Sequence, residues 1–291
     1  MDLFTAVLLG IIQGIAEFLP VSSSGHLVIF EKIAGFGIPA LPFLACVHAG
    51  TAIAVISVLH RDVIRIVVET WRMIKDIFHN MVEYLGSVRR GTDADYVKIV
   101  RTNYRKLIVL ITVSTIPTAL MGILMERAVR MAAESLLFTG IGLLLTGVIL
   151  LVTSVITPGD ELPRDIPAWK MFLIGVAQGL ALFPGVSRLA VTLSGGIFAG
   201  MSEKTATRIS YLMFIPVSLG ALAAELTVQG TAGFDLTGML PAYAAGTAAA
   251  ALTGIIMGKH VLRFLRARKL TGFAYYCFIA GSAAVVLNYF I

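Results

Sequence analysis

A polar motif inside an apolar segment near the start of the chain limits the folds that the rest can adopt. Segment 10–26 reads GIIQGIAEFLPVSSSGH and places the carboxylate of Glu17, three serine hydroxyls and the imidazole of His26 among apolar side chains. An ionised side chain at bilayer depth costs about 2.5–3.5 kcal/mol, so we expect Glu17 to face a cavity or a partner. Pro20 and Gly25 interrupt the helical pattern, which is typical of a re-entrant helical hairpin whose turn is covered by protein or by a wet cavity.

The composition places this hairpin in a membrane. Of the 291 residues, 57% are hydrophobic and 14% are charged, and the mean hydropathy is +0.89. These values predict a polytopic helical membrane protein. The net charge of +6 does not indicate nucleic-acid binding, because the basic residues gather in two stretches between apolar segments without interleaved aromatic residues. We therefore expect a surrounding bilayer and no nucleic-acid partner.

The polar motif occurs twice in the chain. When the sequence is shifted so that Gln13 lies on Gln178, seven identical residues match within thirteen positions and without a gap, which indicates a structural repeat. The matched pairs are Gly10 and Gly175, Gln13 and Gln178, Gly14 and Gly179, Ala16 and Ala181, Phe18 and Phe183, Val21 and Val186, and Ser22 and Ser187. Arg188 falls opposite Ser23. One copy thus offers an acid, hydroxyls and an imidazole, and the other offers a fixed cation.

The apolar segments predict the same order of elements in both halves of the chain. The first half, 1–156, has a re-entrant hairpin at 3–35 and spans at 41–59, 104–125 and 135–156, the last two joined by a short turn at 126–134. It also has an amphipathic helix over 61–86 that lies at the membrane interface. A connector at 157–168 leads to the second half, 169–291, with a hairpin at 169–200 and spans at 207–228, 238–258 and 271–290.

The number of spans sets the relation between the halves. An odd number of spans per repeat reverses the direction of the second repeat across the bilayer. The predicted fold class is therefore an all-α integral membrane protein of two inverted-topology repeats, each a re-entrant helical hairpin plus three transmembrane helices. The basic loops 61–106 and 259–270 are expected on the cytoplasmic side, which puts both termini outside.

The spacing within the motif indicates its chemistry. Gln13 and Glu17 are four residues apart and share one helix face, and the turn Ser22 to His26 follows on the same side. A hydroxyl or imidazole nucleophile, a carboxylate that orients a base or holds a divalent cation, and an arginine for bidentate phosphate contact are the groups that phosphoryl transfer to water requires. A single serine in a membrane helix is more often a packing residue, but the cluster with His26 and Glu17 favours function.

These motifs resemble those of a known family. Residues 13–26 resemble the (Glu/Gln)xxxGlu and Pro-Val-Ser-Ser-x-Gly-His signatures of the undecaprenyl-diphosphate phosphatases, the bacitracin-resistance family, and Pro184-Gly-Val-Ser-Arg188 resembles that family's Pro-Gly-x-Ser-Arg-Ser-Gly motif. The likeness extends over the whole chain, including 116–122 and 208–216. It implies an enzyme of the cell (plasma) membrane that removes the terminal phosphate of a polyprenyl diphosphate at the outer face, returning the lipid carrier to cell-wall or glycan synthesis.

The resemblance also implies roles for single residues. It makes Glu17 the acid, Ser22 part of the polar turn, Ser23 or His26 the nucleophile or base, and Arg188 the phosphate clamp. The implied substrate-binding residues are Gln13, Ser24, Gly25, Gly185 and Ser187. Family members use a divalent cation, and here magnesium or calcium would be held by Glu17 and Gln13.

Two positions depart from the family pattern. Gln13 stands where the family often has a glutamate, which removes one anionic metal ligand. Leu189 and Ala190 follow Arg188 in place of Ser-Gly, so the diphosphate pocket or the substrate can differ. The alternative function is a polyprenyl-phosphate translocase or an ion-coupled transporter on the same scaffold, since secondary transporters are built from inverted repeats with broken helices. The sequence leaves the oligomeric state open, with a homodimer as one option.

Overall fold

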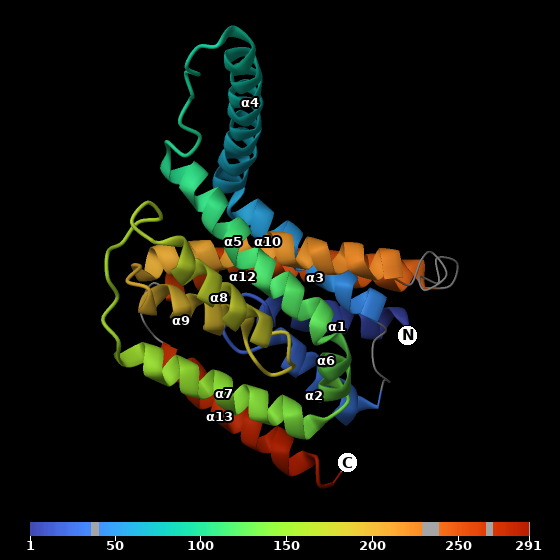
Figure 1. The fold of residues 1–291 in the computed structure, drawn as a ribbon. Helices are drawn as coiled ribbons and strands as arrows, with labels where there is room; N and C mark the ends of the chain where they lie inside the picture. Colours follow the sequence, from blue (N-terminus) through green and yellow to red (C-terminus); the bar gives the residue numbers. More distant parts are fainter. Residues whose placement is uncertain (36–40, 229–238, 266–269, 291) are drawn as a thin grey trace.

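The computed structural model describes residues 1–35, 41–228, 239–265 and 270–290, which form helices and one isolated β-bridge between Glu161 and Met201. In chain order the helices are α1 (Leu3–Ala16), α2 (Ser23–Ala34), α3 (Leu41–Val58), α4 (His60–Arg90), α5 (Asn103–Leu124), α6 (Glu126–Ala133), α7 (Leu136–Val155), α8 (Ala168–Leu180), α9 (Arg188–Phe198), α10 (Glu203–Val228), α12 (Leu240–Leu265) and α13 (Leu270–Leu287). Figure 1 shows a helical bundle from which α4 projects.

Helices occupy the segments that the sequence predicts as membrane spans. Five helices, α5, α7, α10, α12 and α13, are long and apolar enough to cross a membrane, and α3 meets this criterion only together with α4, from which it is bent by 91°. Most boundaries agree within a few residues, although α12 continues to Leu265 instead of ending at 258. Position 238, the predicted start of that span, and positions 266–269 of the second basic loop lie outside the described residues. The all-α, multi-pass class is confirmed.

Each segment predicted as a re-entrant hairpin is a pair of short helices. α1 packs on α2 across a turn at 17–22, and α8 packs on α9 across a turn at 181–187. These four helices have 11 to 14 residues. At about 1.5 Å per residue each is roughly 16–21 Å long, which is too short to cross a hydrocarbon core of about 30 Å.

Close helix packing surrounds the two hairpins. α1 lies along α12, α8 lies along α5, and α7 pairs with α13. Small residues permit this approach, because a Cβ atom at Gly10 would lie 2.3 Å from the carbonyl oxygen of Gly246, and one at Gly175 would lie 2.1 Å from that of Ser114. Both hairpins are therefore held against the bundle by helices from the other half of the chain.

Two segments contain more helix than the sequence predicts. The stretch from Glu126 to Glu134, expected as a turn, contains α6, which is stabilised by the ion pair of Glu126 with Arg130 one turn later. The amphipathic helix continues to Arg90, beyond its predicted end at 86, and ends at Gly91 in a left-handed conformation (φ +65°). A glycine at this position is a common helix stop, because it adopts positive φ without steric cost.

Candidate active site

The two hairpin turns bring the serines of both motifs to helix N-termini. The hydroxyl of Ser22 accepts a hydrogen bond from the backbone N–H of Gly25 (3.3 Å), and the hydroxyl of Ser187 accepts one from the N–H of Ala190 (3.2 Å). These bonds satisfy amides that have no partner within the helix, so both serines begin a helix as N-caps. Ser22 and Ser187 therefore have a structural role whatever else they do.

The carboxylate of Glu17 is the centre of the polar cluster. Its Oε2 accepts hydrogen bonds from Gln13 Nε2 (2.9 Å) and Ser23 Oγ (2.5 Å), and its Oε1 accepts one from a guanidinium nitrogen of Arg188. Glu17 is buried, and buried charges are tolerated when they are paired and hydrogen bonded. The ion pair of Glu17 with Arg188 joins the first hairpin to the second, which brings the acid and the cation of the two sequence motifs into contact.

Arg188 is held on a second side by an aromatic ring. The centre of its guanidinium lies 3.9 Å from the centroid of Phe214 on α10, which is a cation–π contact. Nη1 is buried and makes no hydrogen bond within the described part of the chain. The guanidinium thus combines a fixed plane with an unused donor. A planar cation of this kind suits the oxygens of a phosphate group.

Sequence reasoning missed three residues beside this cluster. His48 on α3 places Nε2 3.8 Å from Glu17 Oε2, while its Nδ1 lies 2.8 Å from the carbonyl oxygen of Leu44. Tyr211 on α10 donates a hydrogen bond to the carbonyl oxygen of Phe18 (2.8 Å), which fixes the turn next to Glu17. Phe214 is the third. In the sequence all three are isolated residues in apolar helices, which more often indicates core packing, so only their proximity in the fold identifies them.

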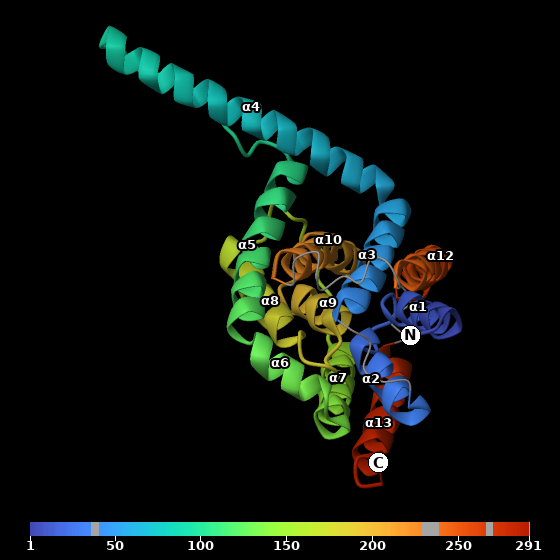
Figure 2. The same ribbon diagram turned by 90° about the vertical axis from the view of Figure 1, so that its right-hand side faces the viewer.

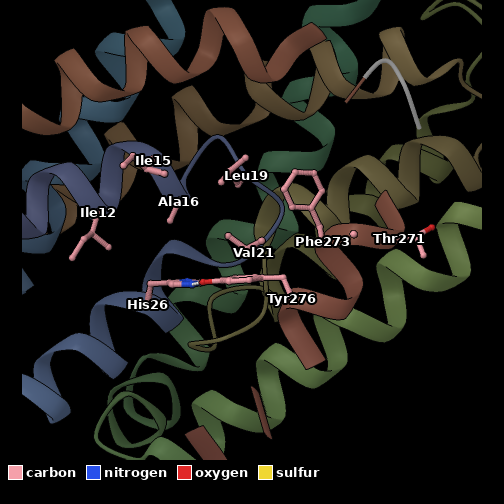
Figure 3. Close-up of a pocket in the computed structure, with 10 residues that line it drawn as sticks. Ile12, Ile15, Ala16, Leu19, Val21, His26, Thr271, Phe273 and Tyr276 are labelled. Atoms are coloured by element: carbon pink, nitrogen blue, oxygen red, sulfur yellow. Dashed lines mark hydrogen bonds between the residues drawn. The ribbon is translucent and has the colours of Figure 1, made fainter. Parts of the chain in front are cut away.

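His26 does not contact Glu17. Its Nδ1 lies 2.7 Å from the carbonyl oxygen of Ser22, and its Nε2 lies 2.5 Å from the hydroxyl of Tyr276 on α13. A carbonyl can only accept, so Nδ1 carries the proton and Nε2 accepts from the tyrosine O–H. The two rings are nearly coplanar, at 4°, and Figure 3 shows them pointing toward one another. Both nitrogens of His26 therefore already have partners.

A largely apolar cavity of about 840 Å³ lies beside the first turn (Figure 3). Its walls come from α1, the turn, α2 and the start of α13. The lining residues are Ile12, Ile15, Ala16, Leu19, Val21, His26, Thr271, Gly272, Phe273 and Tyr276. Glu17 does not line it, although both of its near neighbours Ala16 and Leu19 do. The turn thus has an apolar cavity beside it and an ion pair held by the second hairpin.

The remaining predicted residues take part mainly through the backbone and short contacts. Ser24 Oγ lies 3.2 Å from Ser22 Oγ. Gly25 and Gly185 bring the two hairpins into contact, since a Cβ atom at Gly25 would lie 3.0 Å from Gly185 Cα. Leu189 and Ala190, which replace the family's Ser-Gly, are buried among the core side chains. This departure therefore affects the packing of α9.

The side-chain oxygens of Gln13 and Glu17 are of the kind that binds divalent cations. Gln13 Oε1 is a buried oxygen without a hydrogen-bond partner in the described part of the chain, and amide and carboxylate oxygens are the ligands that Mg²⁺ and Ca²⁺ prefer. No group of three His, Cys, Asp or Glu side chains converges within the described ranges. Gln13 turns its amide nitrogen toward Glu17, so the amide must rotate before Gln13 and Glu17 could supply two oxygens to one cation, with the remaining ligands from phosphate and water.

Replacing Gly185 with alanine is expected to prevent folding. Gly185 has φ +87°, and an added Cβ atom would lie 2.1 Å from the carbonyl oxygen of Thr139 on α7. Gly35→Ala is the matched control, because Gly35 also has positive φ (+67°) but an added Cβ meets nothing within 4 Å, so it should cost only about 1–2 kcal/mol. The yield of monodisperse protein in detergent and its thermal unfolding measure the difference. Similar behaviour of the two variants would contradict the contact.

The chain has full-length relatives among known proteins. The family model described as "Bacitracin resistance protein BacA" matches residues 6–283. A relative in Desulfosudis oleivorans named "Undecaprenyl-diphosphatase" is 35% identical, with 98% of each chain covered. Relatives with the same name in Desulforapulum autotrophicum and Methanosphaera stadtmanae are 33% and 31% identical, with 99% of each chain covered.

Proposed function

This chain belongs to the bacitracin resistance protein BacA family, and from that premise we propose that it is an undecaprenyl-diphosphatase, a membrane enzyme that hydrolyses undecaprenyl diphosphate to the monophosphate and phosphate. The observation that carries the proposal is the ion pair of Glu17 with Arg188 between the two hairpin turns, next to an apolar cavity. A diphosphate on a long apolar tail needs a cationic clamp and an apolar surface in adjacent places.

Arg188 binds the terminal phosphate in this proposal. Its charge is balanced by Glu17, and its Nη1 makes no hydrogen bond within the described part of the chain. A diphosphate carries more negative charge than a carboxylate, so on substrate binding the guanidinium turns part of its contacts to the phosphate oxygens. The aromatic face of Phe214 keeps the guanidinium plane in position. This exchange leaves the carboxylate of Glu17 free to accept a proton.

The contacts favour Ser23 over His26 as the nucleophile. The hydroxyl of Ser23 already donates its hydrogen bond to Glu17, whereas both nitrogens of His26 are engaged. Ser23 Oγ attacks the terminal phosphorus, and its proton moves to Glu17. The bond from phosphorus to the bridging oxygen breaks, and undecaprenyl monophosphate leaves. Water then hydrolyses the phosphoserine and releases inorganic phosphate.

We further propose that a divalent cation binds beside this acid. Glu17 and Gln13 Oε1 would hold it together with substrate oxygens, and when bound it would neutralise charge on the diphosphate. Because the described residues place one carboxylate and one amide oxygen at this position, the affinity for the cation in the absence of substrate is expected to be low.

The apolar cavity supports a lipid substrate. Its side chains come mainly from α1 and α13, and it lies next to the turn that carries Glu17 and leads to Ser23 at the start of α2 (Figure 3). Prenyl units bound there would leave the diphosphate close to the polar cluster. The pairing of α1 with α12 and of α8 with α5 supports the further proposal of two inverted repeats, since each hairpin then packs on the corresponding span of the other half.

Purified protein tests the proposed function most directly. In detergent, we expect it to release inorganic phosphate from undecaprenyl diphosphate, and a Ser23→Ala variant to lose this activity while remaining folded. Undecaprenyl monophosphate should give no phosphate, which controls for a non-specific phosphatase. A protein that moves the lipid between vesicle leaflets without releasing phosphate would instead support the translocase.

We also propose an orientation with both termini outside and the site toward the outer face. Single cysteines in 86–95 and 262–269, in a background without Cys46 and Cys277, should react with a membrane-impermeant thiol reagent only after cell lysis. A cysteine at Gly37, which lies outside the described residues, should react in intact cells. Labelling of both basic stretches from outside would contradict the orientation.

A further inference from the structure

Helix α4 lies at about a right angle to α3, the helix that leads into it. It has 31 residues and turns by 91° from α3 at Leu59. In Figure 2, α12 is seen nearly end-on, whereas α4 runs across the picture and extends beyond the bundle. A helix that leaves the preceding membrane segment at a right angle can lie along a bilayer surface, with one side toward lipid over its whole length.

One face of α4 is apolar and exposed. Its members recur every three or four residues, and half or more of each side chain's surface is accessible. They are Ile64, Val67, Trp71, Ile74, Phe78, Met81, Leu85 and Val88. An apolar strip of this length is far larger than the scattered exposed residues of an ordinary surface, and it includes an aromatic residue of the kind that anchors at a membrane interface.

The acidic residues of α4 are already neutralised by arginines. Asp62 pairs with Arg208 on α10, and Glu69 and Asp76 both accept hydrogen bonds from Arg105 on α5. The bonds from Arg105 lower the pKa of Glu69 and of Asp76, so both acids stay ionised at neutral pH. These ion pairs neutralise the negative charge of Asp62, Glu69 and Asp76 and hold α4 against the bundle.

Several basic residues of α4 are left without a carboxylate. Glu83 pairs with Arg90, but Arg61, Lys75 and Arg89 have no acidic partner within 4 Å in the described ranges. Lys75 follows Trp71 by one turn and lies 5.6 Å from its ring centroid, at the border of the apolar strip. A long cationic side chain at such a border can cover apolar surface with its stem and reach outward with its charge.

We propose that α4 docks on the anionic phospholipid headgroups of the leaflet next to it, with its apolar strip in the interface and its unpaired cations on the headgroup phosphates. The bilayer in which the spans lie is continuous with this strip, and the unpaired charges of α4 have the sign that anionic lipid attracts. Neutral lipid offers the apolar contact but not the charge contact. Docking therefore depends on lipid charge and weakens with salt.

The two tryptophans of the chain allow a direct test. The full-length Trp169→Phe variant leaves Trp71 on α4 as the only reporter, and the Trp71→Phe variant leaves Trp169 on α8 as the control. Each is placed in nanodiscs of phosphatidylcholine, with or without phosphatidylglycerol, and lipids brominated near the glycerol backbone serve as quenchers. We expect bromolipid quenching of Trp71 to rise several-fold with phosphatidylglycerol and to fall again in high salt, while Trp169 does not respond to lipid charge.

Charge variants separate the cations from the apolar strip. In the Trp71 reporter, Lys75→Gln with Arg89→Gln should abolish the response to phosphatidylglycerol, whereas Arg127→Gln on α6 should leave it unchanged. Equal quenching of Trp71 in both lipid mixtures would overturn the proposal, and so would strong iodide quenching in both. Trp71 could also be protected from iodide only in nanodiscs that hold two copies of the protein. That result would show that the apolar strip packs on a second copy of this chain, and it would also overturn the proposal. None of these readouts depends on phosphate release.

Discussion

Replacing Arg188 with lysine is expected to lower the rate of undecaprenyl diphosphate hydrolysis by about a hundred- to a thousandfold, the usual effect of losing one positioned charge contact in a transition state. Lysine keeps the charge but loses the planar fork that holds two oxygens. It also loses the flat contact with Phe214, where the guanidinium lies 3.9 Å from the ring centroid. Phosphate release by the purified variant, at saturating substrate, measures the effect.

Two controls distinguish this result from misfolding. Arg130→Lys changes an arginine in a half-exposed ion pair with Glu126 on α6 and should retain full activity. Thermal unfolding of Arg188→Lys should remain cooperative, since lysine can still balance the charge of Glu17. If Arg188→Lys keeps more than about half of the wild-type turnover, the clamp assignment fails and Arg188 is a structural cation.

Replacing Glu17 with glutamine is expected to abolish activity at every metal concentration. The change removes the group that accepts the Ser23 proton and leaves the buried cation of Arg188 without its anion. Breaking a buried pair in this way typically costs about 3–5 kcal/mol, so a lower unfolding temperature is expected as well. The variant Ser23→Ala separates the two effects, because it should be inactive but close to wild type in thermal stability.

Gln13→Glu is the informative companion to that variant. If Gln13 and Glu17 hold a divalent cation together with substrate, the added carboxylate should lower the magnesium or calcium concentration needed for half-maximal activity, and isothermal titration should detect tighter cation binding. If Glu17 acts without metal, the two neighbouring carboxylates would only repel each other. Full activity of the wild type after exhaustive chelation would eliminate the metal role and leave Glu17 as the base for Ser23.

The fold was largely predictable because its signals are local. Each signal can be recognised within a few turns of one helix. These signals are the apolar runs of span length, the breaks at Pro20 and Gly25, and the 3.6-residue period of α4. The end of α4 and the helical character of α6 were missed, because both depend on helix stops and one-turn ion pairs in polar stretches. The repeat and its inverted arrangement stay predictions. The packing of α1 on α12 and of α8 on α5, each a hairpin helix on a span of the other half, supports them.

The sequence by itself determined the acid, the hydroxyls and the arginine of the site, because these groups stand in two matching motifs and their identification requires no knowledge of distance. Only the tertiary structure decided which of these groups meet. It brought Arg188 to Glu17, turned His26 away to Tyr276, and added His48 from α3. The physical reason is that helical period orders side chains along one helix, whereas contacts between helices depend on how closely backbones pack, as at Gly25 and Gly185.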